Sequence, residues 1–258
     1  MFFKTIDFST HSSIKIGQPT QVLMIEKNDT IPTDRYLIGS ANNLLISSNP
    51  PPLMMLSKDF ATIIQEEEFL IIGGAIPTGR IVSYAKKHDI KGFEFCAKLP
   101  GTLGGMLAMN AGVKEYEIFN ILDAILINNQ WISKEEIPYG YRFAHLNGIA
   151  THGRFKIHKG FDHALLETLL NLRSNQPNEP SAGSIFKNPP NEYAGRLIEA
   201  VGLKGEQKGQ MQWSNIHANF LVNLGGGTFD EAKYLIELAK QRVYSQFQIL
   251  LKEEVKIL

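Results

Sequence analysis

The run Pro100-Gly101-Thr102-Leu103-Gly104-Gly105-Met106-Leu107-Ala108-Met109-Asn110-Ala111-Gly112 is rich in glycine and other small residues. Small residues let successive backbone N–H groups point at one anion, an arrangement that suits a pyrophosphate. The run is neither a G-x-G-x-x-G dinucleotide fingerprint nor a Walker A loop. Taken alone, it is consistent with a structural glycine turn as well as with a phosphate-binding loop.

A second glycine-containing turn, Ile38-Gly39-Ser40-Ala41-Asn42-Asn43-Leu44-Leu45, follows another apolar, strand-like segment. It also places small residues where a backbone can approach a phosphate closely. Two such turns in one half of the chain favour anion binding more than either turn does alone. A structural role for both turns stays open at this point.

A third unusual stretch, Pro-Ser-Ala-Gly-Ser-Ile-Phe-Lys-Asn-Pro-Pro, occupies Pro180–Pro190. Gly183 allows a turn or a close approach to a ligand, and the proline pair stops any regular element just beyond. The stretch therefore predicts a fixed loop that presents Ser184 and Lys187. An ordinary surface turn is the alternative interpretation.

Length and charge exclude some classes of function. A chain of 258 residues can form one large domain or two to three small ones. Lys+Arg 26 and Asp+Glu 26 cancel, which argues against nucleic-acid binding but leaves anionic small molecules open.

Cysteine and histidine usage indicates the cellular compartment and the kinds of site to expect. Cys96 is the only cysteine, so no internal disulfide can form, which fits a cytoplasmic protein. Its apolar neighbours predict a small buried hydrophobe rather than a nucleophile. The seven histidines form no close pair with ligand spacing, so we expect no metal site. We also expect no signal peptide and no membrane span, because long apolar runs are lacking.

Hydrophobic patterns predict a mixture of strands and helices. Short apolar runs bounded by turn residues predict strands at Val22–Glu26, Tyr36–Ile38, Phe69–Ile72 and Ile249–Leu258, and a hairpin of Ile121–Asn128 with Trp131–Ile132 around Asn129-Gln130. Helices are predicted after Thr78 as N-cap, at Ala194–Val201, and after the capping box Thr228-Phe229-Asp230-Glu231.

The two halves of the chain are joined by a polar segment, residues 171–180, which contains two prolines. We place a domain boundary there, with residues 1–176 before it and 177–258 after it. The proline run at residues 50–52 marks a further break, near residues 49–57, inside the first part.

Together the Pro100 and Pro180 stretches resemble the UDP-N-acetylenolpyruvoylglucosamine reductases, also called UDP-N-acetylmuramate dehydrogenases. Supporting matches run nearly end to end: Ser13–Gly17, Gly140-Tyr141-Arg142, Ala194–Gly205, His217–Asn223 and Glu254-Val255. The short connection between Arg142 and Ser184 resembles the shorter type of the family. The resemblance implies an α+β fold, with a two-subdomain FAD-binding module of the vanillyl-alcohol-oxidase-like (PCMH) type and a C-terminal α+β substrate domain.

The resemblance also assigns the cofactor loops. Where family members carry a Gly-Gly-Gly-Ser-Asn-Leu-Leu loop around the FAD pyrophosphate, this chain keeps Gly39 and Asn43-Leu44-Leu45 but has Ser40, Ala41 and Asn42 between them. The Pro100 loop matches almost throughout. The residues expected to bind FAD are Gly39, Ser40, Ala41, Asn42, Asn43, Leu44, Pro100, Gly101, Thr102, Gly104, Gly105, Asn110, Ala111, Gly112 and Arg173.

Arg142 and a C-terminal glutamate are the expected charge-handling groups. A planar guanidinium suits a carboxylate clamp, although most arginines are solvated. In the family, the arginine matching Arg142 faces the enolpyruvyl carboxylate of the substrate. Strand alternation favours Glu253 as the perturbed acid because it places Glu253 on an apolar face, whereas the resemblance favours Glu254. We follow the resemblance.

The resemblance implies the following reaction in peptidoglycan precursor synthesis. NADPH reduces FAD, and hydride then passes to the enolpyruvyl methylene carbon of UDP-N-acetylglucosamine enolpyruvate. Arg142 and Glu254 stabilise the enolate, and Ser184 protonates the adjacent carbon. Tyr141, Lys187 and Asn188 are expected to bind the substrate, and the enzyme is expected to be a monomer with only small-molecule partners. Such an activity would serve cell wall biogenesis, cell shape and cell division.

Two other functions stay open. The chain could be another FAD oxidoreductase of the same fold that acts on a different substrate. It could also be a degenerate nucleotide-binding protein that has lost flavin through Ala41 and Asn42.

Overall fold

The computed structural model describes residues 1–97, 99–172 and 176–258. The chain forms two compact units. The first unit comprises Met1–Lys4, Val22–Ser40 and Pro52–Ser174, and the second comprises Thr5–Gln21, Ala41–Pro51 and Asn175–Leu258. Each unit therefore combines segments that are far apart in the sequence.

Two sheets organise the first unit. One has the order β1-β2-β5-β3, in which β5 pairs parallel with both β2 and β3; the last residues of β1 and the first of β2 are assigned to the second unit. The other is antiparallel, with the order β11-β10-β14-β7-β6. These strands are β1 (Phe2–Asp7), β2 (Pro19–Ile25), β3 (Tyr36–Leu37), β5 (Leu53–Leu56), β6 (Ile63–Glu66), β7 (Phe69–Gly73), β10 (Leu122–Ile127), β11 (Gln130–Ser133) and β14 (Ala150–Lys156).

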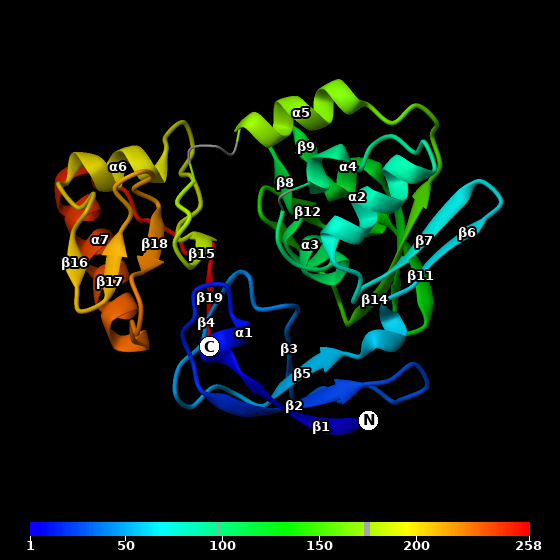
Figure 1. Cartoon of the computed structure of the whole chain (residues 1–258), viewed down its shortest axis with the longest axis horizontal. Coiled ribbons are helices and arrows are strands. Elements are labelled where there is room, and N and C mark those ends of the chain that lie inside the picture. Colours follow the sequence, from blue (N-terminus) through cyan, green and yellow to red (C-terminus); the bar gives the residue numbers. More distant parts are fainter. Residues whose placement is uncertain (98, 173–175) are drawn as a thin grey trace. The chain divides into compact units, whose positions relative to one another are not determined.

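Helices and two small hairpins complete the first unit. The hairpins are β8 (Gly112–Val113) with β9 (Tyr116–Glu117) and β12 (Tyr139–Gly140) with β13 (Phe143–Ala144). The helices are α2 (Thr78–Lys87), α3 (Leu103–Met109), α4 (Ile118–Ile121) and α5 (His163–Leu172), with 3-10 turns η1 (Lys58–Phe60), η2 (Glu94–Cys96) and η3 (Lys134–Glu136). Figure 1 shows α2, α3 and α4 gathered beside the five-stranded sheet.

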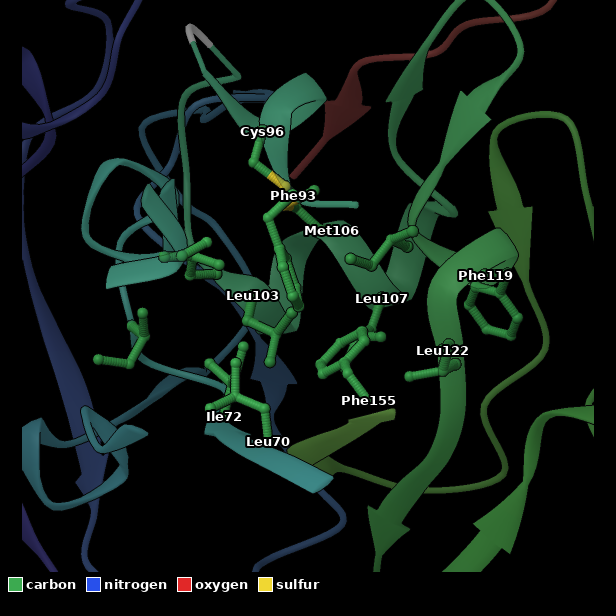
Figure 2. Close-up of a cluster of buried hydrophobic side chains, with 14 of the residues drawn as sticks. Leu70, Ile72, Phe93, Cys96, Leu103, Met106, Leu107, Phe119, Leu122 and Phe155 are labelled. Carbon is green, nitrogen blue, oxygen red and sulfur yellow. The ribbon is translucent and has the colours of Figure 1, made fainter. Parts of the chain in front are cut away.

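The core of the first unit forms around α3. Figure 2 shows Leu103 and Leu107 of this helix near Phe155 of β14, and all three side chains are buried. The Phe93 ring meets the Phe155 ring edge-on, with centroids 5.2 Å apart. Cys96 is fully buried in the same cluster, as predicted, and burial together with the charge of Glu94 raises the pKa of its thiol. This packing fixes α3 and therefore the Pro100–Gly112 run that contains it.

The second unit contains an antiparallel sheet of order β15-β18-β17-β16. Helix α7 packs against β16 and β17 (Figure 1). The elements of this unit are α1 (Phe8–His11), β4 (Leu44–Leu45), β15 (Ser181–Ser184), α6 (Ala194–Ala200), β16 (Gln207–Lys208), β17 (Met211–Trp213), β18 (Phe220–Asn223), α7 (Phe229–Phe247) and β19 (Lys256–Ile257).

Two early segments join the second unit, although we placed them in the FAD-binding module. The Nδ2 atom of Asn223 donates hydrogen bonds to the backbone oxygens of Ile14 (3.0 Å) and Lys15 (3.2 Å). Leu45 lies in β4, which pairs parallel with β19, and it shares a buried core with Ile14. These segments belong to the second unit because of long-range strand pairing and burial. Local sequence patterns do not show such contacts.

Several local predictions are confirmed. The Thr228 side chain accepts from the backbone of Glu231, the carboxylate of Glu231 accepts from the Thr228 backbone, and α7 follows directly. Helix α6 and strand β7 also lie where they were predicted.

Among the described residues, no helix combines the length and apolar character needed to cross a membrane.

Other local predictions are wrong. Pro77, not Thr78, is the N-cap of α2, because the Thr78 hydroxyl donates to the backbone oxygen of Leu99 instead. The turn between β10 and β11 is Asn128-Asn129, because both positions have positive φ, which asparagine tolerates well.

The predicted strand over Ile249–Leu258 is also wrong. Only Lys256–Ile257 forms a strand, and an isolated bridge joins Phe186 to Glu253. Strand length depends on the length of the partner edge, and the partner here, β4, has only two residues. Because Glu253 is not part of a strand, strand alternation does not predict which way its side chain points.

Candidate active site

A small pocket in the first unit is lined mainly by glycines and other small residues. It has a volume of about 140 Å³, and its lining includes Gly39, Gly74, Ala75, Thr102, Gly104, Gly105 and Ala108. A Cβ added to Gly39 would lie 3.1 Å from the Thr102 hydroxyl, and one added to Gly104 would lie 3.1 Å from the Gly74 oxygen. The missing side chains therefore allow the backbone segments around this pocket to pack closely against one another.

The backbone donors of the Pro100 loop are not arranged as we expected. The N–H groups of Leu103 and Gly104 donate to the backbone oxygens of Ile76 (3.0 Å) and Gly74 (2.9 Å). The N–H of Gly105 points at the Thr102 hydroxyl, 3.5 Å away. The N–H groups of Leu103 and Gly104 therefore do not face an anion, because they hold the loop against the residues that follow β7.

The Gly39–Leu44 loop crosses the boundary between the units. Gly39 and Ser40 belong to the first unit, and Ala41–Leu44 belong to the second. Ala41 has φ of 55°, in the left-handed region, where a Cβ costs about 1–2 kcal/mol. The loop thus keeps a glycine-like turn although it has an alanine there.

Hydrogen bonds fix the second half of this loop. The backbone N–H of Ser13 donates to the Ala41 oxygen (3.2 Å), and its hydroxyl donates to the Asn42 oxygen (3.0 Å). The side-chain amide of Asn43 donates to the backbone oxygen of Glu254 (3.0 Å), and the Lys256 N–H donates to the Asn43 oxygen (3.0 Å). The loop and the C-terminal segment thus form one hydrogen-bonded structure.

Asn110, predicted to bind the cofactor, uses its side chain within the protein. It is fully buried, and its Nδ2 atom donates to Glu117 Oε2 (2.7 Å) and to the Gly140 oxygen (3.1 Å). Its Oδ1 atom accepts from the Phe119 N–H (3.2 Å). The Asn110 N–H also donates within the protein, to the backbone oxygen of Leu107 (3.4 Å).

Its two neighbours are equally constrained. The N–H of Ala111 donates to the backbone oxygen of Met106 (2.9 Å). A Cβ on Gly112 would lie 2.1 Å from the backbone oxygen of Tyr116, so only glycine fits there.

Arg142 is not the solvated arginine of the alternative interpretation, because its side chain is only 17% exposed. Its Nη2 atom donates to the Gly112 oxygen (2.9 Å), and its Nη1 atom lies 3.6 Å from Glu117 Oε1. The guanidinium carbon also lies 5.0 Å from the ring centre of Tyr141, whose side chain is exposed. A guanidinium held in this way is suited to binding a carboxylate.

The predicted loop over Pro180–Pro190 is wrong at its start, because Ser181–Ser184 form strand β15 and Ser184 pairs with Phe220 of β18. Residues 185–190, which follow Ser184, form what we call the serine loop. Gly183 before Ser184 has φ of 80°, a left-handed conformation that favours glycine. The N–H of Ile185 after Ser184 donates to the Asn219 oxygen (2.9 Å). The side chain of Asn219 pairs with both backbone groups of Phe186, at 3.0 and 2.8 Å. Asn219 is thus a loop-fixing residue whose role we did not predict.

Ser184 lines a pocket of about 360 Å³ in the second unit, together with Asn188, Tyr193, Arg196, His217 and Asn219. Asn188 Oδ1 accepts from the Ala194 N–H (3.1 Å), which orders the start of α6. Burial lowers the pKa of His217, whose Nδ1 accepts from the Asn219 N–H (3.2 Å). The hydrogen bond to the Asn219 backbone agrees with the prediction that His217 is a structural hydrogen-bonding residue.

The two C-terminal glutamates have different surroundings. The Glu253 carboxylate lies 2.8 Å from Lys240 Nζ, so its side chain does not face an apolar surface as alternation predicted. The Glu254 N–H donates to the backbone oxygen of Ile185 (2.8 Å), the residue that follows Ser184. The backbone of Glu254 is therefore tied to the serine loop.

Lys187 contacts the C-terminal segment through its backbone. The Lys187 N–H donates to the Lys252 oxygen (2.9 Å), which extends the link between the serine loop and the C-terminal segment. Arg173, predicted to bind the cofactor, lies outside the described residues. Within the described part of the chain, no group of three or more histidine, cysteine or acidic residues is arranged to hold a metal ion.

A larger cavity, of about 770 Å³, lies elsewhere in the first unit. Its lining includes Phe93, Phe95, Glu117, Asn120, Lys134 and Leu165, and it contains none of the predicted site residues.

Comparison with known proteins identifies relatives along the whole chain. Residues 176–258 match the model of the UDP-N-acetylenolpyruvoylglucosamine reductase C-terminal domain. The chain is 47% identical to the UDP-N-acetylenolpyruvoylglucosamine reductase of Helicobacter pylori (strain ATCC 700392 / 26695), over 100% of both chains. It is 45% identical to the reductase of the same name from Campylobacter jejuni (strain RM1221), over 98% of this chain and 99% of that one.

A solved structure agrees with these sequence relatives. The UDP-N-acetylenolpyruvylglucosamine reductase from Thermus caldophilus has a TM-score of 0.85 and 26% identity, over 100% of this chain and 99% of that one. The resemblance stated from the sequence and the predicted fold class are both confirmed.

Proposed function

The chain belongs to the UDP-N-acetylenolpyruvoylglucosamine reductase family, and we propose that it reduces UDP-N-acetylglucosamine enolpyruvate to UDP-N-acetylmuramate. The reductant is NADPH, and FAD carries the electrons. The product serves peptidoglycan synthesis, and the absence of a disulfide framework supports a cytoplasmic setting. We further propose that the enzyme acts as a monomer on small-molecule substrates.

The glycine-lined pocket fits part of an FAD molecule. Gly39, Gly104 and Gly105 leave room for close backbone approach, and the left-handed Ala41 keeps its loop turned as a glycine would. These residues and their neighbours in the two loops would hold the diphosphate region. When bound, the flavin supplies two-electron hydride chemistry that no side chain can perform.

The side chains of this chain handle the substrate's charge and protons. Arg142 binds the enolpyruvyl carboxylate and stabilises the negative charge that develops on it when the methylene carbon accepts hydride. A protonated Glu254 stabilises the same enolate by hydrogen bonding. Ser184 then donates its hydroxyl proton to the adjacent carbon as a general acid.

One observation carries this proposal. In a chain with full-length reductase relatives, Ser184 ends strand β15 and lines a pocket, and the backbone that follows it forms hydrogen bonds with Asn219 and Glu254. A proton donor must be held at a fixed position to act on carbon, and these contacts support such a role for Ser184.

The direct test is NADPH oxidation with and without the enolpyruvyl sugar. We expect yellow protein whose flavin is released by acid, and NADPH oxidation that depends on the sugar. Sugar-independent oxidation with oxygen or small alcohols would favour another flavin oxidoreductase. A colourless protein that takes up no FAD would favour a degenerate nucleotide-binding protein, although the retained turn at Ala41 argues against that outcome.

A further inference from the structure

Arg142 lies in a turn, and a turn does not by itself restrict the conformation of a long side chain. It follows Tyr141 in the two-residue turn between β12 and β13, and its φ is 58°. An arginine side chain has about 2 kcal/mol of rotamer entropy to lose, so a turn alone would leave its guanidinium spread over many directions. The 17% exposure of this side chain shows that other groups confine it.

Two oxygens on the β8–β9 hairpin confine the guanidinium. The Gly112 backbone oxygen accepts from Nη2 at 2.9 Å, and Glu117 Oε1 lies 3.6 Å from Nη1. Contacts at two different nitrogens of one planar group define the direction of that plane. The Glu117 contact is longer than a hydrogen bond, so this carboxylate orients the guanidinium by charge.

Glu117 is itself held in place. Its second oxygen, Oε2, accepts a hydrogen bond of 2.7 Å from Asn110 Nδ2. Asn110 is fully buried, ends α3 as its C-cap, and also donates to the Gly140 oxygen two residues before Arg142. The carboxylate thus links a rigid, buried amide on one side to the guanidinium on the other.

We propose that Glu117, oriented by Asn110, is a positioning residue for Arg142 and sets how well Arg142 binds the substrate carboxylate. This inference rests on the proposed function, since it takes the enolpyruvyl carboxylate as the group that Arg142 meets. It assigns Glu117 no contact with the substrate.

A purely structural role for Glu117 makes different predictions. If the carboxylate only supported the β8–β9 hairpin, its loss would lower stability or flavin content and would affect all ligands alike. If it positions Arg142, its loss affects ligands that carry the carboxylate and spares those that lack it. UDP-N-acetylglucosamine lacks the enolpyruvyl group and is therefore the matched control ligand.

The test compares Glu117→Gln with Glu115→Gln, the same substitution two residues earlier at an exposed side chain. Calorimetry on the oxidised, FAD-loaded enzyme measures the Kd of each ligand. In Glu117→Gln we expect the Kd for the enolpyruvyl sugar to rise about 10- to 100-fold, since the loss of one hydrogen bond to a charged group costs this order. The Kd for UDP-N-acetylglucosamine should stay within about twofold, and Glu115→Gln should match the wild type for both ligands.

A double-mutant cycle identifies the route of the effect. Arg142→Lys should weaken binding of the enolpyruvyl sugar, and Glu117→Gln added to it should weaken binding little further, because the group being positioned is already altered. Stopped-flow reduction of the flavin by NADPH should be unchanged in Glu117→Gln, whereas reoxidation by the sugar should slow.

If Glu117→Gln loses flavin, the test uses Glu117→Asp instead. Aspartate keeps the negative charge, but its side chain is one methylene shorter, so the carboxylate lies farther from Arg142. We expect the same ligand-selective loss at smaller size. The inference is overturned if the losses at Glu117 are equal for both ligands, are no larger than in Glu115→Gln, or add fully to those of Arg142→Lys. In those cases wild-type turnover of the sugar still supports the proposed function, whereas a wild type inactive with the sugar refutes both.

Discussion

Replacing Asn219 by alanine should lower the free energy of unfolding by about 2–6 kcal/mol. The Asn219 side chain is 3% exposed and forms hydrogen bonds with both the N–H (3.0 Å) and the oxygen (2.8 Å) of Phe186. Alanine would leave these two backbone groups unpaired beside a residue that is only 1% exposed. A buried polar group left without a partner costs about 1–3 kcal/mol, and two such groups give the stated range.

The measurement is urea unfolding followed by fluorescence. The chain has two tryptophans, so Trp131→Phe makes Trp213 the single reporter. Trp213 is buried, and its ring stacks on Phe186 with centroids 6.0 Å apart, so its emission reports on the loop that Asn219 holds. Linear extrapolation then gives the free energy of unfolding for each variant in this background.

Two further variants sharpen the measurement. Asn215→Ala makes the same change at an exposed position and should shift stability by no more than about 0.5 kcal/mol. Asn219→Asp nearly keeps the shape but sets a carboxylate oxygen against the Phe186 oxygen, so it should cost at least as much as alanine. The reasoning is refuted if Asn219→Ala costs less than about 1 kcal/mol, or if Asn219→Asp is tolerated.

Three further predictions concern the chemistry and the cofactor. Ser184→Ala should leave flavin reduction by NADPH near the wild-type rate and slow reoxidation by the enolpyruvyl sugar about 10²–10⁴-fold, and fast reoxidation in stopped flow would show that this serine is not the proton donor. Glu254→Gln should reduce steady-state turnover far more than Glu253→Gln, which loses only a partly exposed ion pair with Lys240, and equal losses would reject the assignment. Gly104→Ala should lower flavin absorbance per mole of protein, because its Cβ would lie 3.1 Å from a backbone oxygen, and full flavin content would show that the close approach is not needed.

Features that depend on near neighbours in the chain were predictable from the sequence. The Thr228 and Glu231 capping box needs only a three-residue spacing, and the structure has it as predicted. Gly183 predicted a special backbone turn, and its φ of 80° confirms one. The glycine-rich loops and the serine loop were also recognisable, because the small residues that permit close approach are themselves the signal.

Features that depend on distant partners were decided by the tertiary structure. Ile249–Leu258 has strand composition, but only Lys256 and Ile257, opposite β4, form a strand, and Glu253 forms an isolated bridge with Phe186. Glu117 carried no pattern of its own, and its role follows from Asn110 and Arg142, which lie 7 and 25 positions away. Asn219 belonged to a recognised segment, yet only folding brings its amide to Phe186, 33 positions earlier. Local sequence determines which backbone conformations are low in energy. Hydrogen bonds between residues far apart in the chain form only when folding and burial bring the two residues together.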